Sequence, residues 1–255
     1  MHSTHASLDL DSRRRKAEKV LRILELDPSA GPTLDVLEIG CGSGGISHYL
    51  GTLPGPRFRV NAVDVEDLRV VKDGYAFTRV AGTKLPFDDG RFDLVVSNHV
   101  IEHVGPREEQ LAHLREIGRV LRSTGTGYLA VPSRWQVVEP HFRLPFLGWL
   151  PRRLGDLYVR IARRGRAYDC RPLSLRQIDR LVAESRMVGT NAGVSAVRAM
   201  LAIESGGWRL ARSLLRHVPD GVLSMILPLF PTHVLVLQPD PGARKPGQVA
   251  AGGGH

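Results

Sequence analysis

The sequence predicts an α/β fold with a doubly wound, mostly parallel seven-stranded sheet, helices on both faces and helical lid insertions. Short runs rich in β-branched and aromatic residues alternate with segments of helical periodicity, which is typical of parallel sheets. The chain has 255 residues, of which 42% are hydrophobic and 24% charged. This composition fits one α/β domain and excludes collagen, coiled-coil and wholly disordered proteins.

Each element is expected from its local pattern. Apolar residues recur at helical spacing from Ala17 to Leu24 and predict a short leading helix that ends before Pro28. The same periodicity predicts further helices at 43–53, 108–122 and 174–182. Strands are predicted at 34–39, 58–65, 77–81, 92–97, 126–131, 188–197 and 233–237.

The chain is expected to form a single domain over residues 1–240, followed by a disordered tail at 241–255 that lacks core-forming residues. Two long segments depart from the strand and helix alternation, and we interpret 133–172 and 198–231 as lid insertions. The longest apolar stretch, 222–237, is broken by prolines and is too short to span a membrane.

Charge and cysteine usage indicate where the protein works. The net charge is +9, and residues 134–171 contribute +6 of it, with nine basic and three acidic residues. A partner selected by charge would therefore meet this segment. The N-terminus lacks the apolar core of a secretory signal, and Cys41 and Cys170 are too far apart in sequence to suggest a disulfide scaffold. We expect a cytoplasmic protein.

A glycine-rich loop follows the first predicted strand. Glycines allow a backbone to approach a ligand closely, and a helix that begins after the loop offers N–H groups. The spacing Gly40-x-Gly42-x-x-Gly45, with Asp64 about twenty residues later, also satisfies the dinucleotide fingerprint of nicotinamide oxidoreductases. That alternative leaves Glu38 unexplained, whereas an acid at this point suits a ligand with an ammonium group.

Two further blocks extend the pattern of the glycine loop. The run from Glu38 to Gly44 reads E-x-G-x-G-x-G, the run from Leu85 to Val104 contains LPF, FDLVVS and EHV, and Arg115 to Arg122 precedes the fifth strand. In this order the blocks resemble class I S-adenosylmethionine-dependent methyltransferases of the type 11-like family. The resemblance implies a Rossmann-like methyltransferase fold, a cofactor-binding half at 34–132 and S-adenosylmethionine as the cofactor.

The resemblance also implies roles for individual residues. The glycine loop would contact the methionine end, Asp64 would hold the ribose hydroxyls, and Asn98 with His99 would face the methyl group. The usual acid for the adenine amine is replaced by Ala81, which leaves the backbone from Gly82 to Leu85, or Thr83, for adenine. The implied cofactor residues are Glu38, Gly40, Cys41, Gly42, Gly44, Asp64, Val65, Gly82, Thr83, Leu85, Asn98 and His99. Purely structural roles remain alternatives for Asp64, Asn98 and His99.

A general base is expected after the fifth strand. Glu139 and His141 lie two residues apart around Pro140, so that a carboxylate can orient an imidazole. His103 is a further catalytic candidate. The alternatives are that Glu139 and His141 brace a lid turn and that His103 has a packing role. No metal site is expected, because neither Glu102-His103 nor Glu139-Pro140-His141 has further ligands at a convincing spacing.

The insertions indicate the acceptor. Residues 152–166 combine an apolar helical stripe with arginines, a pattern that suits an anionic membrane surface, an acidic substrate or a lid whose stripe points inward. The apolar segment around Trp208 would wall a hydrophobic pocket. We expect methyl transfer, with oxygen favoured, to a small-molecule, sugar or lipid-linked acceptor, with peripheral contact at the inner face of the membrane as an option.

Two alternatives to this function stay open. A nucleic-acid methyltransferase is disfavoured, because amino-methylating enzymes carry a polar-Pro-Pro-aromatic run where this chain has Ser97-Asn98-His99-Val100. A non-catalytic protein that binds S-adenosylmethionine as a scaffold is compatible with every motif. The sequence makes no prediction about oligomeric state.

Overall fold

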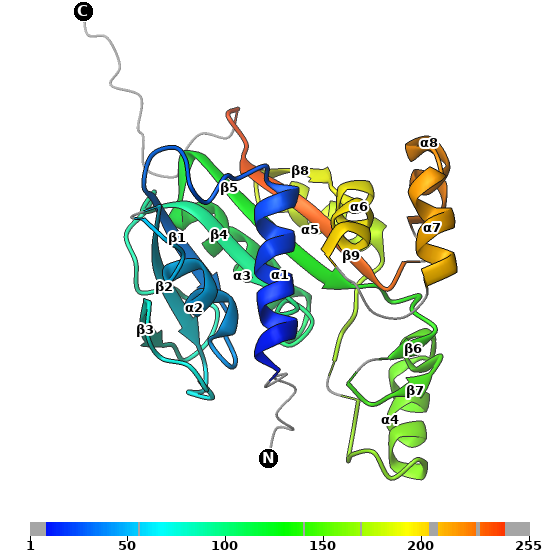
Figure 1. Ribbon diagram of the computed structural model, residues 1–255. Helices are drawn as coiled ribbons and strands as arrows, with labels where there is room; N and C mark the ends of the chain where they lie inside the picture. The colour runs from blue at the N-terminus through cyan, green and yellow to red at the C-terminus, as the bar shows by residue number, and fades with distance from the viewer. Residues whose placement is uncertain are drawn as a thin grey trace, which may run out of the picture.

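The seven-stranded sheet organises the molecule (Figure 1). The computed structural model describes residues 9–55, 57–139, 141–168, 170–203, 209–227 and 230–242. The strand order is β3-β2-β1-β4-β5-β9-β8. The strands are β1 (Leu34–Ile39), β2 (Phe58–Asp64), β3 (Tyr75–Arg79), β4 (Phe92–Asn98), β5 (Leu121–Pro132), β8 (Met187–Asn191) and β9 (Thr232–Pro239). This sheet confirms the predicted fold class.

The first five strands are parallel, whereas β9 pairs antiparallel with both β5 and β8. The chain order reverses beside β1, since β2 and β3 lie on one side of β1 and β4 and β5 on the other. In open α/β sheets, ligands bind at this switch point, outside the carboxyl ends of the strands. The topology therefore directs attention to the loops after β1, β2 and β4.

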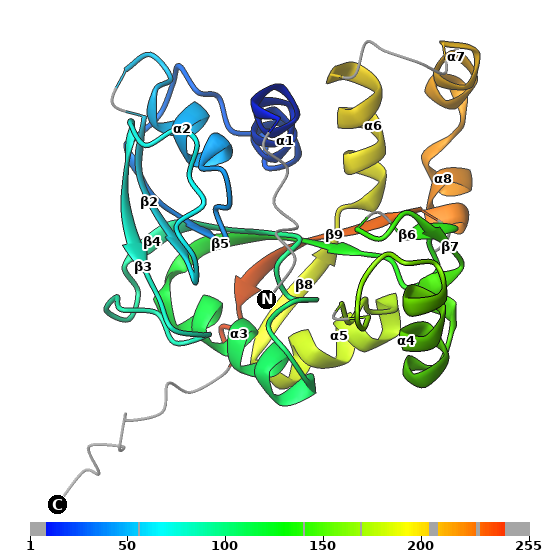
Figure 2. The same ribbon diagram turned by 90° about the horizontal axis from the view of Figure 1, so that it is seen from below.

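Helices cover both faces of the sheet (Figure 2). One face carries α1 (Leu10–Ile23), α2 (Gly45–Gly51) and α6 (Gly193–Ile203), and the other carries α3 (Arg107–Val120) and α5 (Leu175–Glu184). Each face has its own hydrophobic core. Val36 and Ile46 lie in the core under α1 and α2, while Leu37 and Leu114 lie in the core under α3. The strands of the centre are buried on both sides, as parallel strands require.

Two predicted boundaries are wrong. The strand expected at 188–197 ends at Asn191, and α6 begins at Gly193. The Oδ1 atom of Asn191 accepts a hydrogen bond from Gly193 N at 2.8 Å and so starts the helix. Val197 and Leu201 then pack at helical spacing on Leu223. The helix expected to reach residue 122 ends at Val120, because β5 begins at Leu121 beside Phe92.

The segment 133–172 forms a small unit of its own. It contains β6 (Val138–Glu139), β7 (Leu144–Pro145), a 3₁₀ turn (Leu147–Trp149) and α4 (Arg152–Ile161), which lie beyond one end of β5 in Figure 1. Its described residues share a hydrophobic cluster, formed by Phe142, Leu144, Leu147, Val159, Tyr168 and Cys170. Ser133 pairs with Leu173 in an isolated bridge, so the segment leaves and rejoins the sheet domain at one place.

The second departure is helical, as expected. It contains α7 (Arg209–His217) and α8 (Asp220–Ile226), and α6 contacts both of them. No described helix is both long enough and apolar enough to cross a membrane. Trp208, Pro140 and most of the predicted tail, 243–255, lie outside the described residues.

Candidate functional site

The glycine loop after β1 is shaped by backbone conformations that other residues rarely adopt. Gly40, Gly42 and Gly44 have φ values of 72°, 51° and 78°. A Cβ atom at Gly40 would lie 2.5 Å from Val100 Cγ2, and one at Gly44 would lie 2.1 Å from the Tyr75 hydroxyl. The loop therefore requires glycine both for its torsions and for its close contacts.

Cys41 occupies the middle of this loop and points into the core. Its thiol is fully buried, and burial raises the pKa of Cys41 far above the usual thiol value, with Glu38 and Asp64 adding to the rise. Its N–H donates to Val63 O at 3.3 Å. The side chain is therefore a packing residue, and only the backbone of Cys41 remains for the predicted cofactor contact.

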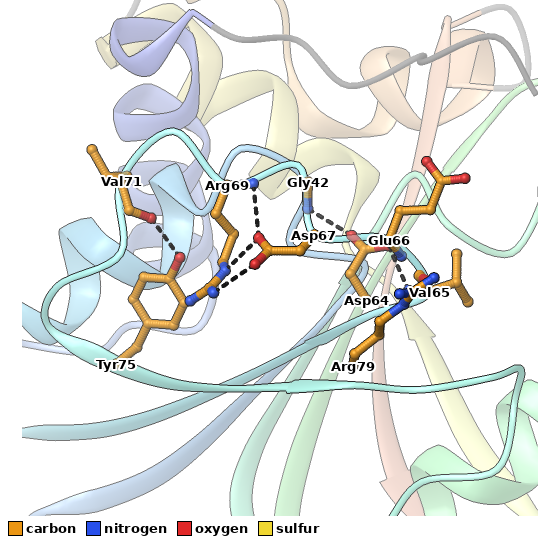
Figure 3. Close-up of polar contacts among 9 residues, drawn as sticks. All are labelled: Gly42, Asp64, Val65, Glu66, Asp67, Arg69, Val71, Tyr75 and Arg79. Carbon is orange, nitrogen blue, oxygen red and sulfur yellow. Dashed lines mark hydrogen bonds and ion pairs between the residues drawn. The ribbon is translucent and has the colours of Figure 1, made fainter.

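Asp64 lies at the carboxyl end of β2 and faces the glycine loop (Figure 3). Its Oδ2 accepts a hydrogen bond from Gly42 N at 2.8 Å, and its Oδ1 accepts one from Val65 N at 2.7 Å. A longer bond from Glu66 N reaches Oδ1 at 3.4 Å. A carboxylate has about four acceptor positions, so these three bonds fix its orientation and leave capacity on Oδ2 for a hydroxyl. The geometry fits the predicted ribose contact.

Glu38 ties the loop to α2. Its Oε2 accepts from Ser47 N at 2.9 Å and from Ser47 Oγ at 2.5 Å. Burial raises the pKa of Glu38 to about 7, although the Ser47 hydrogen bonds and Arg13 oppose the shift. Glu38 is thus a buried acid whose pKa lies near neutral pH. It is placed under the loop, where a cationic group would stabilise its ionised form.

The predicted adenine region is only partly available. A hollow of about 430 Å³ is lined by Val65, Arg79, Val80 and Ala81, at the carboxyl ends of β2 and β3. Leu85 N donates to Glu116 Oε2 at 2.8 Å, and Leu85 O accepts from Arg119 at 3.0 Å. The backbone of Leu85 is therefore engaged by α3, a correction to its expected role as a hydrogen-bonding partner of adenine. Gly82 and Thr83 keep that role as predictions.

The end of β4 presents a polar and strained stretch. Asn98 is buried, and its Nδ2 atom has no hydrogen-bond partner among the described residues. His99 has a φ of 58°, in the left-handed region that few residues other than glycine adopt, and its N–H donates to Ala130 O at 2.9 Å. A buried amide without a partner is costly, so Asn98 Nδ2 is available to a ligand group, and its cofactor contact stays a prediction.

A second polar group lies where the insertion meets the loop after β4. His141 Nδ1 lies 2.6 Å from Glu139 Oε1, and Phe142 N donates to Glu139 Oε2 at 2.7 Å. The predicted pairing of Glu139 with His141 is therefore present, with the carboxylate buried and orienting the imidazole. The same carboxylate also braces the turn, so the contacts that both alternatives require are present, and the catalytic role stays a prediction.

His103 lies beside this pair, with the His103 and His141 ring centroids 4.9 Å apart. Glu102 precedes it and is fully buried, and neither of its carboxylate oxygens has a hydrogen-bond partner among the described residues. Glu102 Oε1 lies 3.6 Å from His99 Nδ1 and 3.8 Å from His103 Nε2. Burial acts to raise the pKa of Glu102, but His99 and His103 outweigh it and the pKa lies below its usual value.

Sequence reasoning missed two members of this region. Cys170 Sγ lies 3.7 Å from His141 Nδ1, although 29 residues separate them in sequence. Lys16 on α1 has a pKa lowered to about 8, because burial and then Arg13 disfavour its charge, while Glu102 and Glu38 oppose the shift. No motif includes either residue. A lysine among the apolar positions of the leading helix is the only signal in the sequence.

The apolar stripe of α4 does not point inward. Leu154, Leu157 and Ile161 are 52%, 47% and 71% exposed, whereas the helix packs through Gly155 and Val159. The interpretation of 152–166 as a lid with an inward stripe is therefore wrong. Exposed apolar and basic side chains on one segment leave the other two interpretations, a membrane surface or an acidic substrate.

Comparison with known proteins identifies the type of domain in the first half of the chain. Residues 37–129 match the sequence family described as a methyltransferase domain. A sarcosine/dimethylglycine N-methyltransferase from Halorhodospira halochloris is 33% identical over 126 residues, which cover 45% of this chain and 42% of that protein. The match thus spans less than half the length of that relative. It lies in the half of the chain that carries the glycine loop, and this agrees with the predicted resemblance.

Solved structures share the fold over most of the chain. A sarcosine dimethylglycine methyltransferase candidate from Galdieria sulphuraria superposes with a TM-score of 0.51 and 13% identity, covering 88% of this chain and 86% of that one. PKMT2 from Rickettsia typhi, in complex with AdoHcy, superposes with a TM-score of 0.53 and 13% identity, covering 90% and 54%. These superpositions show the fold. The family match shows the type of domain.

Proposed function

Because this chain carries a methyltransferase domain of the class I, S-adenosylmethionine-dependent family, we propose that it transfers a methyl group to an oxygen atom of a small-molecule, sugar or lipid-linked acceptor. The observation that carries the proposal is the arrangement of Asp64 under the glycine loop, with Gly42 N held at 2.8 Å. The buried Asn98 amide lies at the end of the central strand β4. These groups fit the ribose and the methionine end of the cofactor.

S-adenosylmethionine supplies a methyl group on a positively charged sulfur. The protein holds the donor and the acceptor in line and excludes water, and such alignment is worth about 7–11 kcal/mol of activation free energy. Asp64 and the glycine loop fix the donor. The buried Glu38 lies under this loop and favours a cationic ligand.

His141 is proposed as the group that accepts the proton of the acceptor hydroxyl. Its Nδ1 faces Glu139 at 2.6 Å, so Nδ1–H donates to the carboxylate and Nε2 carries the lone pair. With S-adenosylmethionine bound, its sulfur would be the leaving group for the methyl and would retain the electron pair, and His141 Nε2 would take the proton that the acceptor hydroxyl gives up. A base in this position contributes typically about 10²- to 10⁴-fold in rate. His103 is the second candidate for the same role.

A lipid-linked acceptor is supported by the exposed apolar surface of the insertion. We call it the α4 patch, and it consists of Trp135, Val137, Val138, Phe146, Trp149, Leu154, Leu157 and Ile161. Trp149 stacks edge-on with Trp135 and Phe146, at centroid distances of 6.0 and 5.0 Å. Arginines follow the patch from Arg152 to Arg166. Exposed apolar side chains and arginines in one segment suit the interface of an anionic membrane.

The cofactor is tested by calorimetric titration of the full chain with S-adenosylmethionine, S-adenosylhomocysteine and NAD. We expect the two adenosyl ligands to bind and NAD not to bind. Asp64→Ala should weaken binding by about 100-fold, the equivalent of one strong hydrogen bond to a charged group. Glu108→Ala, which removes an exposed carboxylate on α3, is the matched control. Equal binding by Asp64→Ala and the control would contradict the proposed ribose contact.

The acceptor is tested with labelled S-adenosylmethionine and three classes of compound: lipid-linked saccharides in vesicles, water-soluble sugars, and sarcosine as an amine acceptor. The relative from Halorhodospira halochloris is named as an N-methyltransferase, so transfer to sarcosine is the main alternative. The proposal requires that sarcosine is not methylated. Transfer to a hydroxyl of the lipid-linked class supports the proposal. Tight cofactor binding with no transfer to any acceptor would instead favour a non-catalytic scaffold, and transfer to RNA or DNA would favour a nucleic-acid enzyme.

A further inference from the structure

Three side chains with metal-binding atoms meet beside the proposed base. His103 follows β4, His141 lies between β6 and β7, and Cys170 precedes α5. Each of the three residues offers one ligand atom, and these three atoms all lie within 4.8 Å of one another. Cys170 Sγ is 3.8 Å from His103 Nδ1 and 3.7 Å from His141 Nδ1. We infer that His103, His141 and Cys170 form a binding site for a zinc ion.

The ligand types favour zinc over the other common divalent ions. Thiolate and imidazole bind zinc well, whereas magnesium and calcium prefer oxygen ligands. Zinc–nitrogen and zinc–sulfur bonds of about 2.0–2.3 Å place tetrahedral ligand atoms about 3.5 Å apart. The separation of 3.8 Å between Cys170 Sγ and His103 Nδ1 is already close to this value. The ring of His141 also lies beside the sulfur, with Nδ1 at 3.7 Å, and its Nε2 is the atom left for the ion, because Glu139 holds Nδ1. A movement of about 1 Å brings the widest pair to the same spacing.

Carboxylates stand behind both histidines, as they commonly do in zinc sites. Glu139 Oε1 lies 2.6 Å from His141 Nδ1, and Glu102 Oε1 lies 3.8 Å from His103 Nε2. Glu102 is the second, independent indication of a ligand. It is fully buried, and its two oxygens have no hydrogen-bond partner among the described residues. A cation held by His103 would add to the stabilisation that the nearby His99 and His103 give to its charge.

The site is reachable and incomplete. The His103 side chain is 29% exposed, so an ion can enter from solvent, whereas Cys170 is buried. Three protein ligands leave a fourth tetrahedral position for water or substrate, which is the pattern of catalytic zinc sites. The sequence predicted no metal site because it showed no third ligand near His103 or His141. Cys170 is 67 and 29 residues away from them and becomes a neighbour only through folding.

The zinc site and the proposed base share His141. In both cases Glu139 holds Nδ1, and Nε2 either accepts a proton or binds the ion. The two uses exclude one another in a single molecule. With the ion bound, a hydroxyl at the fourth position would become more acidic and would give its proton to solvent water instead of to a histidine base. The metal content of the protein therefore decides which use is real.

The test is metal binding by the full chain. Protein stripped with a chelator is titrated with zinc and, separately, with cobalt(II), whose thiolate complexes absorb in the near ultraviolet. We expect one equivalent of either ion and a thiolate absorption band. Cys170→Ser should abolish the band, and His103→Asn and Cys170→Ser should each weaken zinc binding at least tenfold. Glu139→Gln should weaken it about 10- to 100-fold through the loss of its bond to His141.

His217→Asn is the matched control, because this exposed histidine on α7 lies away from the cluster and should leave the band and the affinity unchanged. Circular dichroism and binding of S-adenosylhomocysteine show whether each variant is folded. If the wild-type chain binds zinc no more tightly than the Cys170→Ser and the His103→Asn variants do, the inference is overturned. Zinc binding is distinguishable from cofactor binding, since Asp64→Ala should lose the cofactor but keep the zinc.

Discussion

The half of the chain at 34–132 and the insertion at 133–172 are built on different principles. The first half buries nearly every side chain of its central strands, and its loop is fixed by glycine torsions and backbone hydrogen bonds. The insertion has a cluster of six buried residues, yet it exposes eight large apolar side chains. The first half is therefore specified by internal constraints, whereas the insertion leaves much of its apolar surface outside its own core.

The largest effect is expected at Gly44. A Cβ atom there would overlap the Tyr75 hydroxyl at 2.1 Å and Val71 O at 2.6 Å, at a φ of 78°. Gly44→Ala should lower the free energy of unfolding by about 2–4 kcal/mol and abolish cofactor binding. Gly221→Ala on α8 is the control, since nothing lies within 4 Å of its added Cβ. Denaturant unfolding of both variants measures the effect, and equal stabilities would refute the constraint on the loop.

The next effect concerns the pH dependence of stability through Glu38. Its pKa is raised by burial from 4.5 to about 7, so the folded state binds the extra proton between these values. Its contribution to stability is complete below pH 4.5 and is lost as the pH rises through 7, by up to about 3 kcal/mol. Glu38→Gln should remove this loss.

His113 must be separated from this effect. Burial lowers its pKa to about 4, so His113 makes the protein more stable as the pH rises from 4 towards 6.5, the opposite sign. The difference between the wild-type and Glu38→Gln unfolding curves cancels that contribution. Curves that stay parallel from pH 4.5 to 7 would show that Glu38 does not titrate in this range.

Two positions on α4 test whether stability depends on the buried side of the insertion and not on its exposed side. Val159 is fully buried and Ile161 is 71% exposed. Val159→Ala should destabilise the protein by about 1–2 kcal/mol, whereas Ile161→Asp should change stability by less than about 0.5 kcal/mol. Ile161→Asp should nevertheless reduce binding to vesicles of anionic phospholipid, measured by co-sedimentation. A loss of stability at Ile161 with unchanged vesicle binding would mean that the α4 patch is covered within the protein itself.

The smallest effect is expected from single arginines beside the patch. Arg163→Gln should weaken binding to anionic vesicles by about fivefold, because one basic residue near such a surface contributes about 1 kcal/mol. The effect should shrink as salt rises and vanish with neutral vesicles. Arg115→Gln on α3 serves as the control outside the insertion. Equal loss in both variants would indicate general attraction by net charge rather than a localised surface.

The sequence predicts the sheet well because its signals are local. Buried parallel strands and a glycine loop are visible in any short window, and Asp64 follows from its distance to the loop. The α6 boundary was missed because Val194 and Val197 favour a strand locally, while Asn191 begins a helix. The orientation of α4 could not be predicted, since periodicity identifies a stripe but not the side on which it packs.

The polar cluster shows the same limit more sharply. Glu139 and His141 were predicted as a pair because they are two residues apart. Cys170 and Lys16 were not, because each reaches the region only through the path of the whole chain. Sites assembled from distant segments leave no spacing to recognise, which is why acceptor chemistry is harder to infer from sequence than cofactor binding.

The bridge between Ser133 and Leu173 has an evolutionary consequence. Because the two ends of the insertion meet there, the 39 intervening residues can be replaced without moving β5 or α5. Loop closure depends only weakly on length, so a much shorter or longer segment would serve the sheet equally well. The junction allows the insertion to vary in sequence and length during evolution. The proposed acceptor site would then change, while the proposed cofactor site in the sheet domain stays the same.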